Sequence, residues 1–277
     1  MVEQKAPSPK WSAEVLLLGG LFLATGLVGV VYGGQTWLPP VASKHGAGID
    51  AMLTYLLVAV GLIFLSGHIV LGVLVWRAGP RARVLHRLAS PRTEWLLSGI
   101  LGLTVVGVGE VGVIAIGIPV WNEYFAAEPP PGALMVEVTG QQFMWNVRYP
   151  GDDGMFGRTD VRLVNDQSNP IGLDRTDPAG ADDIVLQNEL GVAVDRPVRV
   201  RLRSKDVIHS FFVPHLRIKQ DAVPGMMPEI LFVPTREGTF EIACTELCGL
   251  GHYRMQGFLY VLSEAEFGQW LQQRSGG

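Results

Sequence analysis

Near its C-terminus the chain contains the segment Cys244-Thr-Glu-Leu-Cys248-Gly-Leu-Gly-His252-Tyr-Arg-Met255. It brings two thiols, an imidazole and a thioether into twelve consecutive residues. A second imidazole, that of His209, lies upstream in the segment Asp-Val-Ile-His-Ser-Phe. Cysteine and methionine are soft ligands that suit copper, and imidazole suits copper as well. The pattern therefore predicts a copper site.

The number of thiols distinguishes this site from a mononuclear one. A blue-copper site needs two His, one Cys and a weak axial Met, whereas this set has one thiolate more. Two thiolates four residues apart can both bridge two copper ions. Each copper then takes one imidazole and one weak axial donor. Met255 can serve one copper, and the backbone carbonyl of Glu246 can serve the other.

Two other interpretations of the cysteines stay open. They are the only two in the chain, and outside the cytoplasm such a pair can form a structural disulfide. A disulfide, however, does not require His252 and Met255 at these offsets. Zinc is the second alternative, but structural zinc sites use cysteines alone or cysteines with histidines and do not call for a methionine.

The whole motif resembles the dinuclear copper A site of cytochrome c oxidase subunit II. All six ligand positions fall at the family spacing. They are His209, Cys244, Glu246, Cys248, His252 and Met255. Segments 140–149 and 216–225 are also similar to family segments, and the resemblance covers about residues 45–272. It implies a Greek-key, cupredoxin-like barrel that holds two copper ions.

The first 127 residues are predicted to be a transmembrane helical region. Three long stretches contain almost no charge, and each can supply the ~20 apolar residues that a membrane helix needs. The expected spans are about 15–37, 50–76 and 94–121. The first is either a third span or a signal segment; its length and the lack of a clean Ala-x-Ala site favour a retained span.

Loop charge predicts the orientation of these spans. Five arginines lie between residues 77 and 92, so the positive-inside rule makes this loop cytoplasmic. Lys5 and Lys10 agree, because they place the N-terminus on the same side. Residues 128–277 are therefore expected on the periplasmic, extracytoplasmic face of the cell's inner (plasma) membrane.

Beyond the proline run at 129–131, the pattern changes from long apolar runs to short alternating ones. Alternation predicts a membrane-anchored all-β domain. Its expected strands are 135–139, 143–149, 198–202, 240–243 and 256–262. Ser263 and Glu266 form a capping box that predicts a short C-terminal helix to about residue 273. The turn-rich, acidic segment 150–190 is interpreted as an insertion, either a solvated loop or a patch that attracts a basic electron donor.

The resemblance also assigns roles outside the ligand set. In the family, the first tryptophan of a Gln-Trp-x-Trp segment receives the electron from cytochrome c. Phe143 replaces it here, while the second, Trp145, is kept. Asp206 either orients the loop of His209 or forms a turn. Glu94 resembles the family glutamate at the entrance of a proton channel in the large subunit.

The resemblance implies the electron-entry subunit of a respiratory haem–copper oxidase. Such a subunit accepts electrons from a c-type cytochrome or related donor and passes them to haem in the large subunit I, which reduces oxygen to water and pumps protons. Further membrane subunits are expected, and a nucleic-acid partner is not. No residue of this chain is expected to be catalytic, because six histidines and no Cys-x-x-Cys-His motif leave no haem site. The alternatives are the copper A subunit of a nitric oxide reductase and a stand-alone membrane-anchored copper electron-transfer protein.

Overall fold

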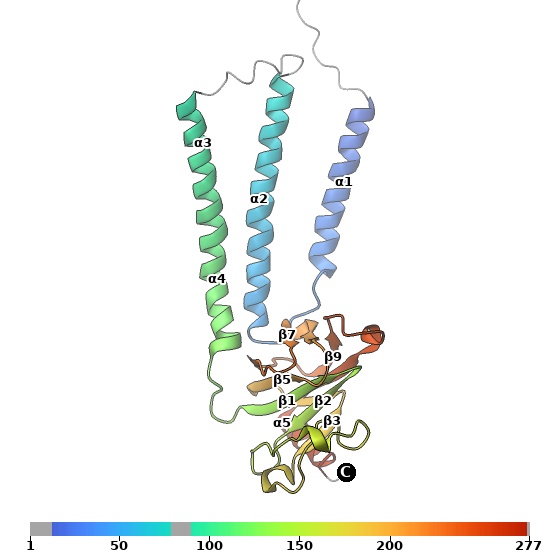
Figure 1. Cartoon of the computed structure of the whole chain (residues 1–277). Helices are drawn as coiled ribbons and strands as arrows, with labels where there is room; N and C mark the ends of the chain where they lie inside the picture. The colour runs from blue at the N-terminus through green and yellow to red at the C-terminus, as the bar shows by residue number, and fades with distance from the viewer. Residues whose placement is uncertain (1–12, 79–89, 276–277) are drawn as a thin grey trace, which may run out of the picture. The chain divides into compact units, whose positions relative to one another are not determined.

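The computed structural model describes residues 13–78 and 90–275 (Figure 1). Its first part is helical. The helices are α1 (Ala13–Thr36), α2 (Gly46–Ala78) and a continuous run of α3 (Pro91–Thr104), η2 (Val105–Glu110), α4 (Val111–Trp121) and η3 (Asn122–Ala126). Segments η2 and η3 are π-helical. Helix α1 lies in a compact unit of its own, and the chain from Val41 onwards forms a second unit.

Two of the described helices are long and apolar enough to cross a membrane. They cover Gly46–Val70 and Pro91–Ala126, each with a mean hydropathy of 2.1. The first apolar stretch forms α1, and its role as a span or a signal segment stays a prediction. Lys5, Lys10 and most of the loop arginines lie outside the described residues, so the orientation also stays a prediction.

The second part is a two-sheet β domain followed by a short helix, as predicted. One sheet has the order β3-β2-β1-β5-β8 and the other β4-β10-β9-β6-β7. The strands are β1 (Leu134–Gln141), β2 (Met144–Tyr149), β3 (Ile184–Gln187), β4 (Glu189–Ala193), β5 (Val198–Ser204), β6 (His209–Val213), β7 (Ile218–Ala222), β8 (Glu229–Phe232), β9 (Gly238–Cys244) and β10 (Gln256–Leu262). Neighbours are antiparallel except β1 with β5 and β4 with β10.

Strand β5 shows how the sequence pattern builds the core. Its apolar residues Val198, Val200 and Leu202 are fully buried between the sheets. The alternating arginines face outward, where Arg199 and Arg201 both pair with Glu229 at 2.6 and 2.7 Å. A period of two places one set of side chains on each face of a strand, so this strand closes the core on one side and carries an ion-pair network on the other.

Helix α5 (Glu264–Gln272) begins with the predicted capping box. The Ser263 hydroxyl accepts from the Glu266 backbone N–H, and the Glu266 carboxylate accepts from the Ser263 N–H at 3.1 Å. The capping-box prediction is therefore confirmed. Each of the two side chains accepts a hydrogen bond from a backbone N–H that has no partner within the helix.

The acidic insertion between β2 and β3 is held by its own charges. Arg148, fully buried in β2, donates to the Asp183 carboxylate at 3.0 Å through Nε and so fixes the insertion's end. Arg158 pairs with Asp174 and Asp177 inside the insertion, at 3.1 and 3.4 Å. These contacts favour the solvated-loop interpretation, because several of the acidic groups neutralise arginines of the same segment.

The segment before α2 runs along the β domain and joins it to the membrane helix. The Ala42 N–H donates to the His215 carbonyl at 2.7 Å, and the Ser43 hydroxyl donates to the Leu216 carbonyl at 2.6 Å. One turn into α2, Asp50 accepts two hydrogen bonds from Arg217, at 2.7 and 3.0 Å. The barrel is thus tied to the beginning of α2 by backbone and ion-pair contacts.

Arg217 makes these contacts from a left-handed backbone conformation, with φ of 56°. This conformation costs a residue with a Cβ roughly 1–2 kcal/mol, and glycine avoids the cost. Arg217→Ala should lose the ion pair and keep the strain, whereas Arg217→Gly should lose the ion pair and relieve the strain. We expect the Gly variant of the full chain to be more stable than the Ala variant by about 1 kcal/mol. The urea midpoint of β-domain unfolding measures this, and an Ala variant at least as stable as Gly would contradict it.

Candidate metal centre

The predicted ligands come together at one end of the second sheet. His209 begins β6, and Cys244 ends β9. These strands pair, with Phe211 opposite Cys244. The other ligands lie on the loop between β9 and β10, and the Cys244 N–H donates to the Met255 carbonyl at 3.3 Å, which closes this loop. Two strands thus fix both ends of the loop beside His209.

The donor atoms form a compact cluster around the two sulfurs. The Sγ atoms of Cys244 and Cys248 lie 3.9 Å apart. Nδ1 of His209 is 4.0 Å from Cys244 Sγ, and Nδ1 of His252 is 3.6 Å from Cys248 Sγ. Each sulfur therefore has an imidazole nitrogen of its own nearby.

The Glu246 carbonyl and the Met255 thioether, the two predicted weak donors, also lie one beside each sulfur. The carbonyl oxygen of Glu246 lies 3.2 Å from Cys244 Sγ, and Sδ of Met255 lies 3.8 Å from Cys248 Sγ. The Glu246 side chain itself is exposed. His209, Cys244, Cys248 and Met255 are buried, so the sulfur cluster is shielded from water.

Both cysteines are free thiols in the structure. A disulfide needs an S–S distance of ~2.05 Å, far below the 3.9 Å observed. Burial opposes ionisation of Cys244, but the His209 imidazole and the Ser210 backbone outweigh burial and lower the pKa of this thiol to about 6. Burial, and then the charge of Cys244, raise the pKa of Cys248 to about 11. A metal that binds both sulfurs must therefore displace the Cys248 proton.

Asp206 lies directly behind His209. The Nε2–H of His209 donates to Asp206 Oδ1 at 2.7 Å, while Nδ1 faces Cys244. The other carboxylate oxygen accepts from the Gln142 backbone N–H, also at 2.7 Å. A carboxylate on the far nitrogen is the usual way to fix the tautomer and ring orientation of a metal-binding histidine.

Gln142 is a site residue that the sequence reasoning missed. Its backbone supports Asp206, and its side-chain Nε2–H donates to the carbonyl of Cys248. It thereby connects the β1–β2 turn with the ligand loop. Nothing in the spacing of the motif points to it, because 106 residues separate it from Cys248.

Phe143 packs beneath the ligand loop and is half-buried. A Cβ at Gly251 would collide with its ring, and a Cβ at Gly249 would lie 3.2 Å from it. Gly249 also has a φ of 136°, which residues with a Cβ rarely adopt. The two glycines of the motif are thus required by the close approach of an aromatic ring, and Arg254 lies 6.0 Å above the same ring.

Trp145 lies behind the site as part of the core. It is fully buried, and its ring centroid is 6.0 Å from that of His209 and 5.6 Å from that of Phe211. Among the described residues its indole N–H has no hydrogen-bond partner. Trp145 therefore restrains His209 by packing.

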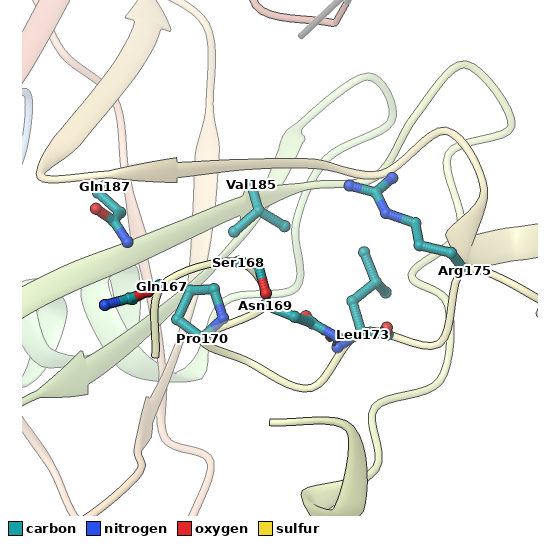
Figure 2. Close-up of a pocket in the computed structure, with 8 residues that line it drawn as sticks. All are labelled: Gln167, Ser168, Asn169, Pro170, Leu173, Arg175, Val185 and Gln187. Carbon is teal, nitrogen blue, oxygen red and sulfur yellow. Dashed lines mark hydrogen bonds between the residues drawn. The ribbon is translucent and has the colours of Figure 1, made fainter. Parts of the chain in front are cut away.

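Two features lie apart from this cluster. Glu94 is in the first turn of α3, which Ser90 caps and where a carboxylate is favoured by the helix dipole. A polar cavity of about 410 Å³ opens between the insertion and β3, and Figure 2 shows Arg175, Leu173 and Gln187 among its lining residues. Arg175 Nη1 donates to the carbonyls of residues 180, 181 and 183. The cavity therefore lies along the contact between the insertion and β3, and none of the candidate ligands lines it.

Comparison with known proteins agrees with this geometry. The family model "Cytochrome C oxidase subunit II, periplasmic domain" matches residues 134–260. The chain is 36% identical over 241 residues to the alternative cytochrome c oxidase subunit 2 of Bradyrhizobium diazoefficiens, covering 86% of this chain and 84% of the relative. It is 30% identical over 269 residues to cytochrome c oxidase subunit 2 of Cereibacter sphaeroides, covering 91% and 84%.

Among solved structures, the periplasmic domain of cytochrome oxidase subunit II from Bradyrhizobium japonicum is 30% identical to this chain. It covers 54% of this chain and 98% of its own length, with a TM-score of 0.39. The sequence relatives decide the assignment, because they extend over most of both chains. This chain, with two long apolar helices ahead of a two-sheet β domain, belongs to the cytochrome c oxidase subunit II family.

Proposed function

We propose that this chain is the electron-entry subunit of a respiratory haem–copper oxidase and holds a dinuclear copper A centre. It takes electrons from a c-type cytochrome and passes them to haem in the large subunit, which reduces oxygen to water. The observation that carries the proposal is the pair of sulfurs 3.9 Å apart, each facing the Nδ1 of its own imidazole. The names of the relatives favour the oxidase over a nitric oxide reductase or a stand-alone copper protein.

The donor set fits two copper ions. His209 Nδ1 and His252 Nδ1 would be the imidazole donors, and Asp206 would hold the His209 ring through Nε2. Cys244 and Cys248 would hold the ions through their thiolates, and Met255 and the Glu246 carbonyl would supply weaker donors. When bound, the two ions supply a one-electron redox centre whose charge change is shared between them.

The chain's own residues keep this centre rigid and dry. Asp206 and Gln142 hold His209 and the Cys248 carbonyl in place by hydrogen bonds. Trp145 and Phe143 fill the space behind and beneath the loop and exclude water. Residues locked by packing and by supporting hydrogen bonds keep a site in one geometry, which suits a group that only gains and loses an electron.

The position in the cell and the role of Glu94 complete the proposal. The arginine-rich loop supports a plasma-membrane orientation with the copper domain outside. Glu94 then lies at the cytoplasmic beginning of the last span, where an exposed carboxylate can gather protons for a channel of the large subunit.

The copper proposal predicts two copper ions per full-length chain. In the oxidised state, electron resonance should show hyperfine splitting from both nuclei. Cys244→Ser or Cys248→Ser should abolish the centre, because both thiolates would be needed to hold the two ions together. Met255→Leu should keep the copper and alter the spectrum, because an axial thioether tunes more than it holds. The exposed Met227→Leu is the matched control.

Metal analysis and electron resonance on the purified variants check this ranking. One copper per chain with a blue-copper spectrum contradicts the dinuclear site. Equal and complete copper loss in the Cys and Met255 variants contradicts the assignment of Met255 as a weak donor.

The second prediction concerns electron entry. Phe143 is half-buried and packs on the ligand loop, but it lacks the indole of the family residue. Phe143→Leu should slow copper reduction by the native cytochrome less than tenfold, which corresponds to less than about 1.4 kcal/mol in barrier. Trp145→Leu should slow it more, because it removes the ring that packs against His209. Phe156→Leu, in the insertion and beneath Arg148, is the control.

Stopped-flow reduction with copper content measured in parallel tests this order. A near-total loss of electron input in the Phe143 variant with copper intact would show that entry depends on this position after all.

A further inference from the structure

Glu110 is the single charged residue in the middle of the last span. Between Trp95 and Trp121 the sequence holds no other Asp, Glu, Lys or Arg. It ends the π-helical segment η2 and directly precedes α4. An ionisable side chain at this depth is costly unless it has a partner, and such side chains face protein rather than lipid.

Within the unit that begins at Val41, the described residues offer Glu110 no polar partner. Its side chain is exposed and makes neither a hydrogen bond nor an ion pair within residues 13–78 and 90–275. Helix α2 contacts this region at other positions. The Tyr55 hydroxyl donates to the Val108 carbonyl, and a Cβ at Gly112 would collide with the Tyr55 ring. The contact with α2 therefore supplies a donor to the Val108 carbonyl of the π-helical segment, but it gives the Glu110 carboxyl no partner.

The chain's other apolar helices also lack a cation that could reach it. The sequence of α1 contains no lysine, arginine or histidine. His68 in α2 donates through Nδ1 to the Phe64 carbonyl at 2.9 Å. It lies thirteen residues beyond Tyr55, which is roughly 20 Å along a helix. Among the described residues, these helices thus offer no basic partner near Glu110, and we look to another chain for its partner.

The helix surface beside Glu110 carries no bulky side chain at Gly107 and Gly109, so a second helix can approach it closely. Gly107 and Gly109 have no atom within 4 Å of the positions where a Cβ would be. Small residues let helix backbones approach closely in membranes, and polar side chains then bond across the contact. The unpaired carboxyl decides what kind of helix fits, because it needs a hydrogen-bond donor.

We propose that Glu110 forms a polar contact inside the membrane with a transmembrane helix of the large haem-bearing subunit. That helix presents a hydrogen-bond-donating side chain at the same depth. Glu110 is thus a specificity-determining residue of the subunit contact. The inference rests on the proposed function, since that function supplies the haem-bearing partner.

The experiment is purification of the full complex through this chain, with haem measured per copper during extended washing in detergent. Glu110→Leu should lose the haem subunit roughly tenfold faster than the wild type, as expected for one interhelical hydrogen bond. Glu110→Gln keeps a hydrogen-bonding group of the same size and should lose it more slowly than Leu. Val111→Leu, at the next exposed position, is the control and should behave as wild type.

A second measurement separates the contact from folding. The thermal midpoint of the chain expressed without its partner should be unchanged or higher in Glu110→Leu, because the carboxyl has no bond within the described chain. A lower midpoint would place the contact inside this chain, for example with α1, and overturn the proposal.

The remaining outcomes are also decisive. If Glu110→Leu retains haem as the wild type does, or if Glu110→Gln is as weak as Glu110→Leu, the hydrogen-bonded contact is wrong. If the wild-type chain itself brings no haem, the proposed function fails instead, so the two failures are distinguishable.

Discussion

The pairing of β9 with β10 is the constraint on which the metal centre depends. Its hydrogen-bonded ladder ends at the pair Ala243–Gln256, so Cys244 and Met255 begin and end the ligand loop side by side. The conformational entropy of closing this loop is lost when the β domain folds, because the sheet fixes both ends of the loop. The pairing of β9 with β10 therefore determines where the candidate donor atoms lie.

The interior of the loop is fixed from a different direction. Gln142 and Phe143 belong to the β1–β2 turn of the other sheet, yet they reach the Cys248 carbonyl and the loop glycines. Asp206, after β5, holds His209 through the far side of its ring. Residues from both sheets thus converge on one loop, so a change in the packing between the sheets would be felt at the ligands even where no ligand is altered.

Local patterns in the sequence predicted the parts of this fold that local forces decide. Strands with clear alternation, such as β5, and the Ser263 capping box were found because neighbouring residues determine them. The short strands β3, β4, β6, β7 and β8 were missed, because four or five residues carry too little periodicity and depend on their partners in the sheet.

The clustering of the six candidate ligands could be predicted because five of them share one short segment and the sixth has a characteristic surrounding sequence. Their supporting contacts could not. Asp50 and Arg217 are 167 residues apart, and only the folded barrel shows that they meet. The left-handed backbone of Arg217 likewise has no sequence signal, because glycine is the residue expected there.

Strand β6 has a consequence for how distance is set in this protein. It begins with His209 and is followed by a single 3₁₀ turn that ends before Arg217. Arg217 donates a hydrogen bond to Asp50, which lies in the first turns of α2. Five extended residues measure roughly 17 Å, and a strand paired on both sides changes its length very little. The strand therefore fixes the distance between the candidate ligand His209 and helix α2. The proline-rich connection after η3 can vary in length or stiffness without changing this distance.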